Sequence, residues 1–290
     1  FLNAGEIIFF ENIRLSEGET KNDDHFAKIL SSIGEIYIND AFSCSHRKQA
    51  SIHKITKYIK DSYAGPLLMK EILSINMVLH DKKSPITCII GGSKISTKIG
   101  VIKSLIKKVD NLVIVGAMAN NFIKFKGNKV GKSLVETSSE IIINEIYDKA
   151  IENNCEIVTP LDFAVSENTE GKANFRELNS VKENEIILDI GPKTIKKICN
   201  IIDASKMVLW NGPAGYFENK DFADGTISIA NKISNNTGSA SLISIVGGGD
   251  TLSAIKNSKL DPNFTHLSTA GGAFLEYIEV KNLPGIEVLK

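Results

Sequence analysis

The chain has 290 residues, and its 34 lysines and arginines balance its 34 aspartates and glutamates, so the formal net charge is zero. A neutral chain is not built to hold nucleic acid or an anionic membrane by bulk electrostatics. With 42% hydrophobic and 23% charged residues, the composition is that of a globular protein rather than a disordered one. The length suits two domains, or one large domain with an appendage.

The sequence carries no sign of export or of a membrane span. No apolar run approaches the roughly 18 residues that a span needs, and the first ten residues lack the pattern of a signal peptide. We therefore expect a soluble, cytoplasmic protein with reduced thiols, because its four cysteines lie far apart without a CxxC pair. The chain opens on Phe1 rather than Met, which indicates a processed product or further sequence upstream.

The first sixty residues predict two strands and one helix. A strand-like run at residues 7–10 precedes a turn at 16–19, a helix near 22–33 and a second strand at 36–38. Two strands and one helix cannot bury their own faces, so this segment is expected to belong to a larger sheet. An amphipathic helix over residues 64–79, with Pro66 in its first turn, then leads into the rest of the chain.

From about residue 84 onward, short runs rich in Ile and Val alternate with helix-length stretches. The strands are expected at 86–90, 112–115, 157–158, 186–188, 207–210 and 242–246, and the helices at 99–109, 138–151, 194–202 and 222–233. Such alternation predicts a parallel sheet covered on both faces. The expected fold class is therefore α/β with two lobes: an incomplete α/β domain over 1–63, a linking helix over 64–80, a doubly wound, Rossmann-like domain over 81–270, and a C-terminal helix and tail over 271–290.

Glycine follows five of the expected strands and also the run that ends at Leu267. These glycines are Gly91, Gly116, Gly191, Gly212, Gly247 and Gly271, several of them within longer glycine clusters. One glycine after a strand usually marks only a tight turn. Six at one edge of a parallel sheet instead predict phosphate binding, because glycine lets backbone N–H groups approach an anion and a helix N-terminus adds partial positive charge.

Several charged side chains near the ends of the expected strands can be interpreted in two ways. Lys94 and Lys98 are four residues apart and are expected to share one face of a helix that begins after the glycine pair; they form either a solvated face or a phosphate contact. Asp250 either caps its helix or provides a carboxylate for Mg²⁺. Arg14 and Arg47, the latter beside His46, are either surface ion-pair partners or ligands of a small acidic substrate.

Several familiar signatures are missing from the sequence. Residues 127–133 resemble a P-loop but have one residue too few between the glycines, and no GxGxxG fingerprint follows a strand. There is also no HExxH motif and no nucleophile elbow. These absences count against nicotinamide or flavin enzymes, zinc proteases and serine hydrolases.

A set of short motifs resembles the phosphoglycerate kinase family along the whole chain. In chain order the matching residues are Glu11 to Arg14, Asn39 to Phe42, His46 and Arg47, Gly91 to Ile99, Asp189 to Pro192, Trp210 to Pro213, Phe217 and Glu218, Gly247 to Thr251, and His266 to Thr269. The resemblance implies a two-lobed glycolytic kinase that transfers a phosphoryl group between 1,3-bisphosphoglycerate and MgADP, giving 3-phosphoglycerate and MgATP. It implies a cytoplasmic monomer that uses Mg²⁺ and binds neither nucleic acid nor membrane.

The resemblance also implies roles for individual residues. Arg14, Arg47 and His46 would bind phosphoglycerate in the N-terminal lobe, while Lys98, with Lys94 nearby, would act on the phosphoryl group in flight. The nucleotide would contact residues in the C-terminal lobe, namely Lys98, Gly191, Asn211, Pro213, Glu218, Gly248, Gly249, Asp250 and Thr251. Glu218 would hold the ribose and Asp250 the Mg²⁺. Transfer to or from a carboxylate needs no catalytic base, which fits this residue set.

In the phosphoglycerate kinase family, further motifs precede the one that begins here at Glu11. An Asp-x-Asn triplet, a further arginine and a His-x-x-Gly-Arg-Pro loop precede that motif in the family and do not occur in this sequence. Two hypotheses follow: the chain is a phosphoglycerate kinase whose sequence begins late, or it is a nucleotide-binding fragment of that enzyme with incomplete catalysis.

Overall fold

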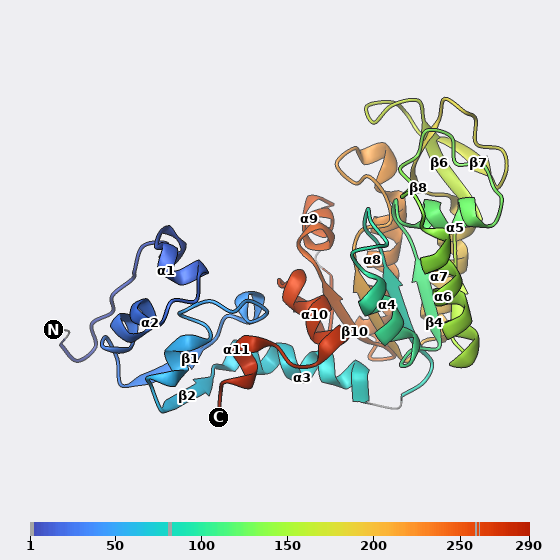
Figure 1. Ribbon diagram of the computed structural model, residues 1–290. Helices are drawn as coiled ribbons and strands as arrows, with labels where there is room; N and C mark the ends of the chain where they lie inside the picture. The colour runs from blue at the N-terminus through green and yellow to red at the C-terminus, as the bar shows by residue number, and fades with distance from the viewer. Residues whose placement is uncertain (1–2, 81–82, 259, 261) are drawn as a thin grey trace. The chain divides into compact units, whose positions relative to one another are not determined.

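The computed structural model describes residues 3–80, 83–258, 260 and 262–290. The chain divides into two compact units, one formed by Phe1–Lys70 with Val280–Lys290 and the other by Glu71–Glu279. Helix α3 (Pro66–His80) begins in the first unit and continues into the second (Figure 1). Among the described residues, no helix is long and apolar enough to cross a membrane.

The first unit contains a two-stranded parallel sheet and several short helices. Strands β1 (Ile36–Asn39) and β2 (Asp61–Ala64) pair with each other. The remaining elements are η1 (Ile13–Leu15), α1 (Glu17–Thr20), α2 (Asp24–Ser31), η2 (Phe42–Cys44), η3 (Lys54–Lys57) and α11 (Pro284–Glu287). Helix α2 begins where Asp23 accepts a hydrogen bond of 2.7 Å from the Phe26 N–H, as an N-cap side chain does.

The strand expected at residues 7–10 is wrong. These residues adopt no regular secondary structure, and Ile7 and Phe9 are 90% and 98% exposed. A strand needs a neighbour to satisfy its backbone groups, and within the described part of the chain β1 pairs with β2 alone. The apolar alternation of this run is therefore insufficient to make it a strand.

The C-terminal residues return to the first unit, which the sequence did not indicate. The Gly285 N–H donates to the Ser45 carbonyl at 2.8 Å, and the Asn39 side-chain amide donates to the Gly285 carbonyl at 2.9 Å. At the end of the chain, the Lys290 N–H donates to the Ser62 carbonyl at 3.0 Å. The two strands are thus held by backbone that lies more than 200 positions away in the sequence.

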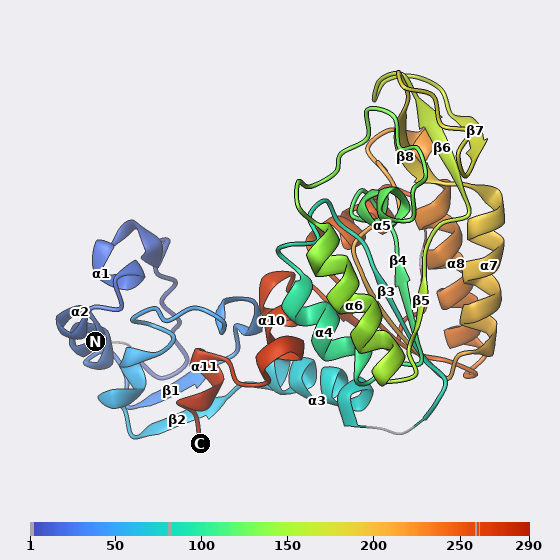
Figure 2. The same ribbon diagram turned by 45° about the vertical axis from the view of Figure 1, so that its right-hand side comes forward.

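The second unit is built on a six-stranded parallel sheet with the order β11-β10-β9-β3-β4-β5. The strands are β3 (Ile86–Ile90), β4 (Asn111–Ile114), β5 (Glu156–Val158), β9 (Met207–Asn211), β10 (Ile243–Gly247) and β11 (His266–Ser268). The helices are α4 (Ile99–Ile106), α5 (Ala119–Phe125), α6 (Glu140–Glu152), α7 (Pro192–Ala204), α8 (Asp224–Gly238), α9 (Gly249–Asn257) and α10 (Gly272–Val280). Helices α4 and α6 cover one face and α7 and α8 the other (Figures 1 and 2). The predicted α/β class with a doubly wound sheet is confirmed.

The strand expected near 186–188 exists, but it does not belong to the parallel sheet. Strand β8 (Ile186–Ile190) pairs antiparallel with β6 (Asp162–Ser166), which also pairs antiparallel with β7 (Asn174–Glu177). A strand parallel to its predecessor needs a crossover of a dozen or more residues, and only three residues separate β5 from β6. The chain therefore leaves the main sheet after β5 and forms this small second sheet.

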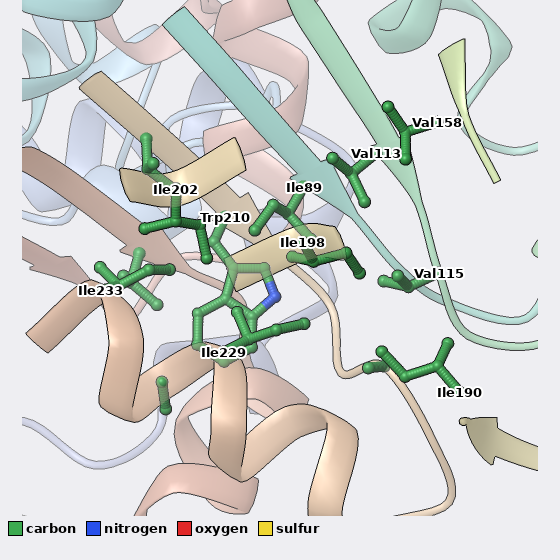
Figure 3. Close-up of a cluster of buried hydrophobic side chains, with 14 of the residues drawn as sticks. Ile89, Val113, Val115, Val158, Ile190, Ile198, Ile202, Trp210, Ile229 and Ile233 are labelled. Carbon is green, nitrogen blue, oxygen red and sulfur yellow. The ribbon is translucent and has the colours of Figure 1, made fainter. Parts of the chain in front are cut away.

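The core of the second unit lies between the parallel sheet and helices α7 and α8. Trp210 on β9 is fully buried there, with Ile89 of β3 and Val113 of β4 on the same face and Ile198 and Ile229 from the two helices opposite (Figure 3). The Trp210 ring N–H donates to the Gly212 carbonyl at 2.8 Å. This bond satisfies the buried indole and links the core to the loop that follows β9.

Candidate functional site

Five of the six glycine turns meet at one edge of the parallel sheet. They follow β3, β4, β9, β10 and β11, whose carboxyl ends lie at the same edge because all six strands are parallel. The sixth, at Gly191, follows β8 in the antiparallel sheet, so the expectation that all six share one sheet edge is wrong.

The turns after β3 and β9 touch through their backbones. The Gly91 N–H donates to the Asn211 carbonyl at 2.8 Å, and a Cβ at Gly91 would lie 2.3 Å from the Pro213 carbonyl oxygen. Gly212 has a φ of +95°, a backbone angle that residues other than glycine rarely adopt. Glycine is thus required on both sides of this contact.

A cavity of about 480 Å³ opens at this edge. One wall is the loop after β9, including Pro213, Tyr216 and Glu218, and Asp250 lies on its border. The other lining side chains are mainly apolar and come from the loops after β3, β4 and α5, from α5 itself and from the antiparallel sheet, among them Ala117, Leu134, Phe163, Ile186 and Leu188. A slot with apolar walls and a polar rim suits a small molecule that has a flat apolar part and a charged part.

Lys98 lies beside the glycine contact. Its ammonium donates to the Gly91 carbonyl and lies 3.5 Å from the Asn211 side-chain oxygen. Burial lowers the pKa of Lys98, although the charge of Asp250 acts in the opposite direction. A partly desolvated cation held by backbone next to an open cavity is a ready contact for an anion.

Lys94 and Lys98 do not share a helix face as predicted. Helix α4 begins at Ile99, residues 96–98 form a turn, and Lys94 lies before this turn and is exposed. The helix begins late because the Glu136 carboxylate accepts hydrogen bonds from the N–H groups of Ile95 and Ser96 and from the Ser96 hydroxyl. The carboxylate therefore holds the loop in a turn ahead of the helix.

The first turn of α9 closes the other side of the site. Gly248 has a φ of +101° and leads into Gly249, Asp250 and Thr251, the first residues of the helix. The buried Thr251 hydroxyl accepts a hydrogen bond of 2.7 Å from the Gly212 N–H, which joins this turn to the loop after β9. The first N–H groups of a helix have no partners within it, so the turn can receive an anion.

Asn211 has an unsatisfied donor between these elements. The residue is 5% exposed, and within the described part of the chain its side-chain nitrogen makes no hydrogen bond. That nitrogen lies toward Gly248, where an added Cβ would be 3.0 Å from it. A buried donor of this kind costs free energy unless a ligand satisfies it.

Gly191 lies at a different kind of helix start. The Asp162 carboxylate accepts hydrogen bonds from the Lys193 and Thr194 N–H groups at 2.9 and 2.8 Å, and a Cβ at Gly191 would lie 2.4 Å from that carboxyl group. The first turn of α7 is thus already capped by the protein. Its neighbour Ile190 lines the cavity, and Gly191 itself does not.

The remaining predicted site residues lie in the first unit, around Cys44. The Arg14 guanidinium donates to the Cys44 sulfur at 3.3 Å, and the Arg47 N–H donates to the Cys44 carbonyl at 3.0 Å. The Arg47 side chain contacts the His46 ring at 3.3 Å. Both arginines are exposed, so this unit presents two cations close to one short segment.

Two buried or half-buried carboxylates were missed in the sequence. Glu136 anchors the Lys98 loop as described, and Asp189 lines the cavity and accepts hydrogen bonds of 2.8 Å from the Gly225 and Ile190 N–H groups. Burial raises the pKa of Asp189 to about 8, against the effect of these two bonds. Asp189 opens a matched motif in the sequence, but a single carboxylate in a strand gives no sign of what it contacts.

The protein offers few metal ligands in one place. Among the described residues, no group of three His, Cys, Asp or Glu side chains is arranged to hold a metal ion. Of the three carboxylate residues that line the cavity, Asp189, Glu218 and Asp250, it is Asp250 that lies in the first turn of α9. This donor set suits a hard cation that shares its coordination between one carboxylate, water and the phosphates of a ligand.

Comparison with known proteins identifies the family. The family model of phosphoglycerate kinase matches residues 1–281. Phosphoglycerate kinases from Wolbachia sp. subsp. Drosophila simulans and from Orientia tsutsugamushi strain Ikeda are 46% and 44% identical to the chain, which spans 73% and 71% of their lengths. The matches cover 100% and 99% of the chain itself.

Solved structures agree with the sequence relatives. The phosphoglycerate kinase of Coxiella burnetii matches with a TM-score of 0.87 and 38% identity, and that of Pyrococcus horikoshii OT3 with 0.81 and 27%. Each comparison covers 96% of this chain and 71% of the other. The chain therefore belongs to the phosphoglycerate kinase family.

Proposed function

We propose that the cavity at the sheet edge binds the nucleotide of the phosphoglycerate kinase reaction, the transfer of a phosphoryl group between 1,3-bisphosphoglycerate and ADP. The observation that carries the proposal is the convergence of three anion-binding features: the Lys98 ammonium, the unsatisfied Asn211 nitrogen and the first turn of α9. Each favours phosphate oxygens. Lys98 and Asn211 do not line the apolar slot themselves, but Gly92, Pro213 and Asp250 next to these features do, and the slot is large enough for a base.

Within this site, the phosphates would contact Gly248, Gly249 and Thr251, with Lys98 directed at the group that is transferred. Pro213 contributes to the wall for the base, and Glu218, exposed on the border, would accept hydrogen bonds from the ribose hydroxyls. Gly191, next to the cavity residue Ile190, would lie at the outer edge of the nucleotide. The exposed Lys94 would add charge near the phosphates.

Members of this family use a magnesium nucleotide, and Asp250 is the residue we assign to the ion. Mg²⁺ bound to the nucleotide phosphates would neutralise part of their charge during transfer. Asp250 would orient the ion directly or through water, while the cationic Lys98 would stabilise charge on the other side of the phosphoryl group. The unsatisfied Asn211 donor fits an additional phosphate oxygen.

We assign the phosphoglycerate to the first unit. Arg14 and Arg47, with His46 beside Arg47, would bind its phosphate and carboxylate, because arginine matches both groups with two parallel hydrogen bonds. The first unit would then be the phosphoglycerate-binding part and the second the nucleotide-binding part. We place the protein in the cytoplasm as a monomer, in keeping with a glycolytic role.

Direct titration tests the nucleotide site. Isothermal titration of the protein with MgADP is expected to show binding with one site and a dissociation constant between micromolar and millimolar. A folded sample that gives no heat at millimolar MgADP would exclude the proposed site.

Asp250→Asn tests the assignment of the ion. Without the carboxylate, MgADP is expected to bind about tenfold more weakly, since loss of a charge-assisted contact costs on the order of 1.5 kcal/mol. Binding of ADP in the presence of excess EDTA is expected to be the same in both proteins. Equal weakening with and without Mg²⁺ would instead assign Asp250 to the nucleotide alone.

A further inference from the structure

Asp189 connects three segments around the nucleotide cavity. It lies at the carboxyl end of β8 with 2% of its surface exposed, and its two carboxyl oxygens accept the N–H groups of Ile190 and Gly225. Gly225 belongs to the first turn of α8. A Cβ at Gly215, in the loop after β9, would lie 2.4 Å from the same carboxyl group, so that backbone packs directly on it.

Thr226, the next residue of α8, extends this connection to the cavity wall. Its buried hydroxyl accepts a hydrogen bond of 2.9 Å from the Ala214 N–H. In the same loop, two residues after Ala214, the Tyr216 N–H donates to the Leu188 carbonyl of β8 at 2.7 Å. The loop from Gly212 to Glu218, which forms one wall of the cavity, is thus held between β8 and the start of α8, and Asp189 fixes these two elements to each other.

We infer that Asp189 and Thr226 are positioning residues for the nucleotide, because they fix the loop that forms the cavity wall. The inference rests on the proposed function, since it assumes that the nucleotide occupies this cavity. Neither residue needs to change between the ground state and the transition state. Their loss is therefore expected to weaken nucleotide binding without slowing the transfer step at saturation.

Asp189→Asn is the informative variant. Each oxygen of a carboxyl group keeps a lone pair whether or not the group is protonated, but the nitrogen of an asparagine amide accepts no hydrogen bond. One of the two N–H groups, of Ile190 or of Gly225, must then lose its partner while the side chain keeps its shape. Thr226→Val is the second variant; it removes only the acceptor for the Ala214 N–H.

Two control variants separate positioning from general destabilisation. Glu185→Gln alters a buried carboxylate just before β8 that binds Arg176 and the Lys182 N–H and does not line the cavity. Thr237→Val removes a hydroxyl near the other end of α8, where it bonds to Ser244 and the Ile233 carbonyl. Both controls remove polar contacts of the second unit away from the loop.

For all five proteins the experiment measures the MgADP dissociation constant by titration, the melting temperature, and kcat at saturating nucleotide in a coupled assay to which the family's amino-terminal segment is supplied. We expect Asp189→Asn and Thr226→Val each to raise the dissociation constant about tenfold, with kcat within twofold of wild type. The two controls are expected to lower the melting temperature and leave the dissociation constant within twofold.

Unchanged nucleotide affinity in the folded Asp189→Asn and Thr226→Val proteins would overturn the inference, as would equal weakening in the two controls. If Asp189→Asn does not fold, Thr226→Val decides by itself. Absence of binding in the wild-type protein would reject the proposed function, and the inference with it, whereas wild-type binding with unaffected variants rejects the inference alone.

Discussion

In a version of the protein that carries the family's amino-terminal segment, Lys98→Ala is expected to lower kcat about a hundredfold while changing the nucleotide dissociation constant by less than threefold. In the protein alone, the Lys98 ammonium is held by the Gly91 carbonyl and lies near the Asn211 side chain, so its charge is already placed before substrate arrives. Such a preorganised charge acts most strongly on the phosphoryl group in flight, and its loss costs on the order of 3 kcal/mol in the transition state. Steady-state kinetics and titration on the same preparation measure both quantities.

The stability of this variant provides a second readout. Burial already disfavours the charged form of Lys98, as the lowered pKa indicates, so its removal is not expected to reduce the melting temperature. Lys107→Ala, which alters an exposed lysine at the opposite end of α4, is the matched control and is expected to leave kcat unchanged. A Lys98→Ala enzyme with wild-type kcat would remove this residue from the mechanism.

The sequence predicted the parallel part of the fold because the signals there are local. Buried strands such as β3 and β9 are continuous apolar runs, and the helices between them have the length of a crossover. The antiparallel sheet was missed because the partner of β8 is decided by which strands the connecting loops permit. Residues 7–10 show the converse, since an apolar run without a neighbour forms no strand.

The candidate site, too, could be predicted from the sequence only in part. The glycine turns are visible in the sequence because a single residue type records a backbone requirement, as at Gly212 with its positive φ. The return of residues near Gly285 to β1 depends on contacts far apart in the chain, and no local pattern encodes it. Asp189, Glu136 and Thr226 act through backbone N–H groups, which every sequence contains. Only the folded chain shows which N–H groups they meet.

Gly91→Ala is expected to destabilise the second unit by about 3 kcal/mol, within the range for overpacking a filled site. The added Cβ would lie 2.3 Å from the Pro213 carbonyl oxygen and 2.9 Å from the Gly212 carbonyl carbon, and both are backbone atoms that cannot rotate away. The turns after β3 and β9 must then separate, which also breaks the bond of 2.8 Å between the Gly91 N–H and the Asn211 carbonyl. Urea unfolding followed by circular dichroism measures the loss.

The same separation is expected to weaken nucleotide binding, because the turn after β9 carries the Asn211 side chain and the wall residue Pro213, and its Gly212 N–H donates to Thr251 in the first turn of α9. Gly249→Ala is the matched control for folding: a Cβ there has no heavy atom within 4 Å, and the residue lies in the first turn of α9. Alanine suits a helix better than glycine, so this variant is expected to be at least as stable as wild type. If Gly91→Ala unfolds at the same urea concentration as Gly249→Ala, the contact between the two turns can yield to a methyl group, and glycine at position 91 is not required for the close approach that shapes the site.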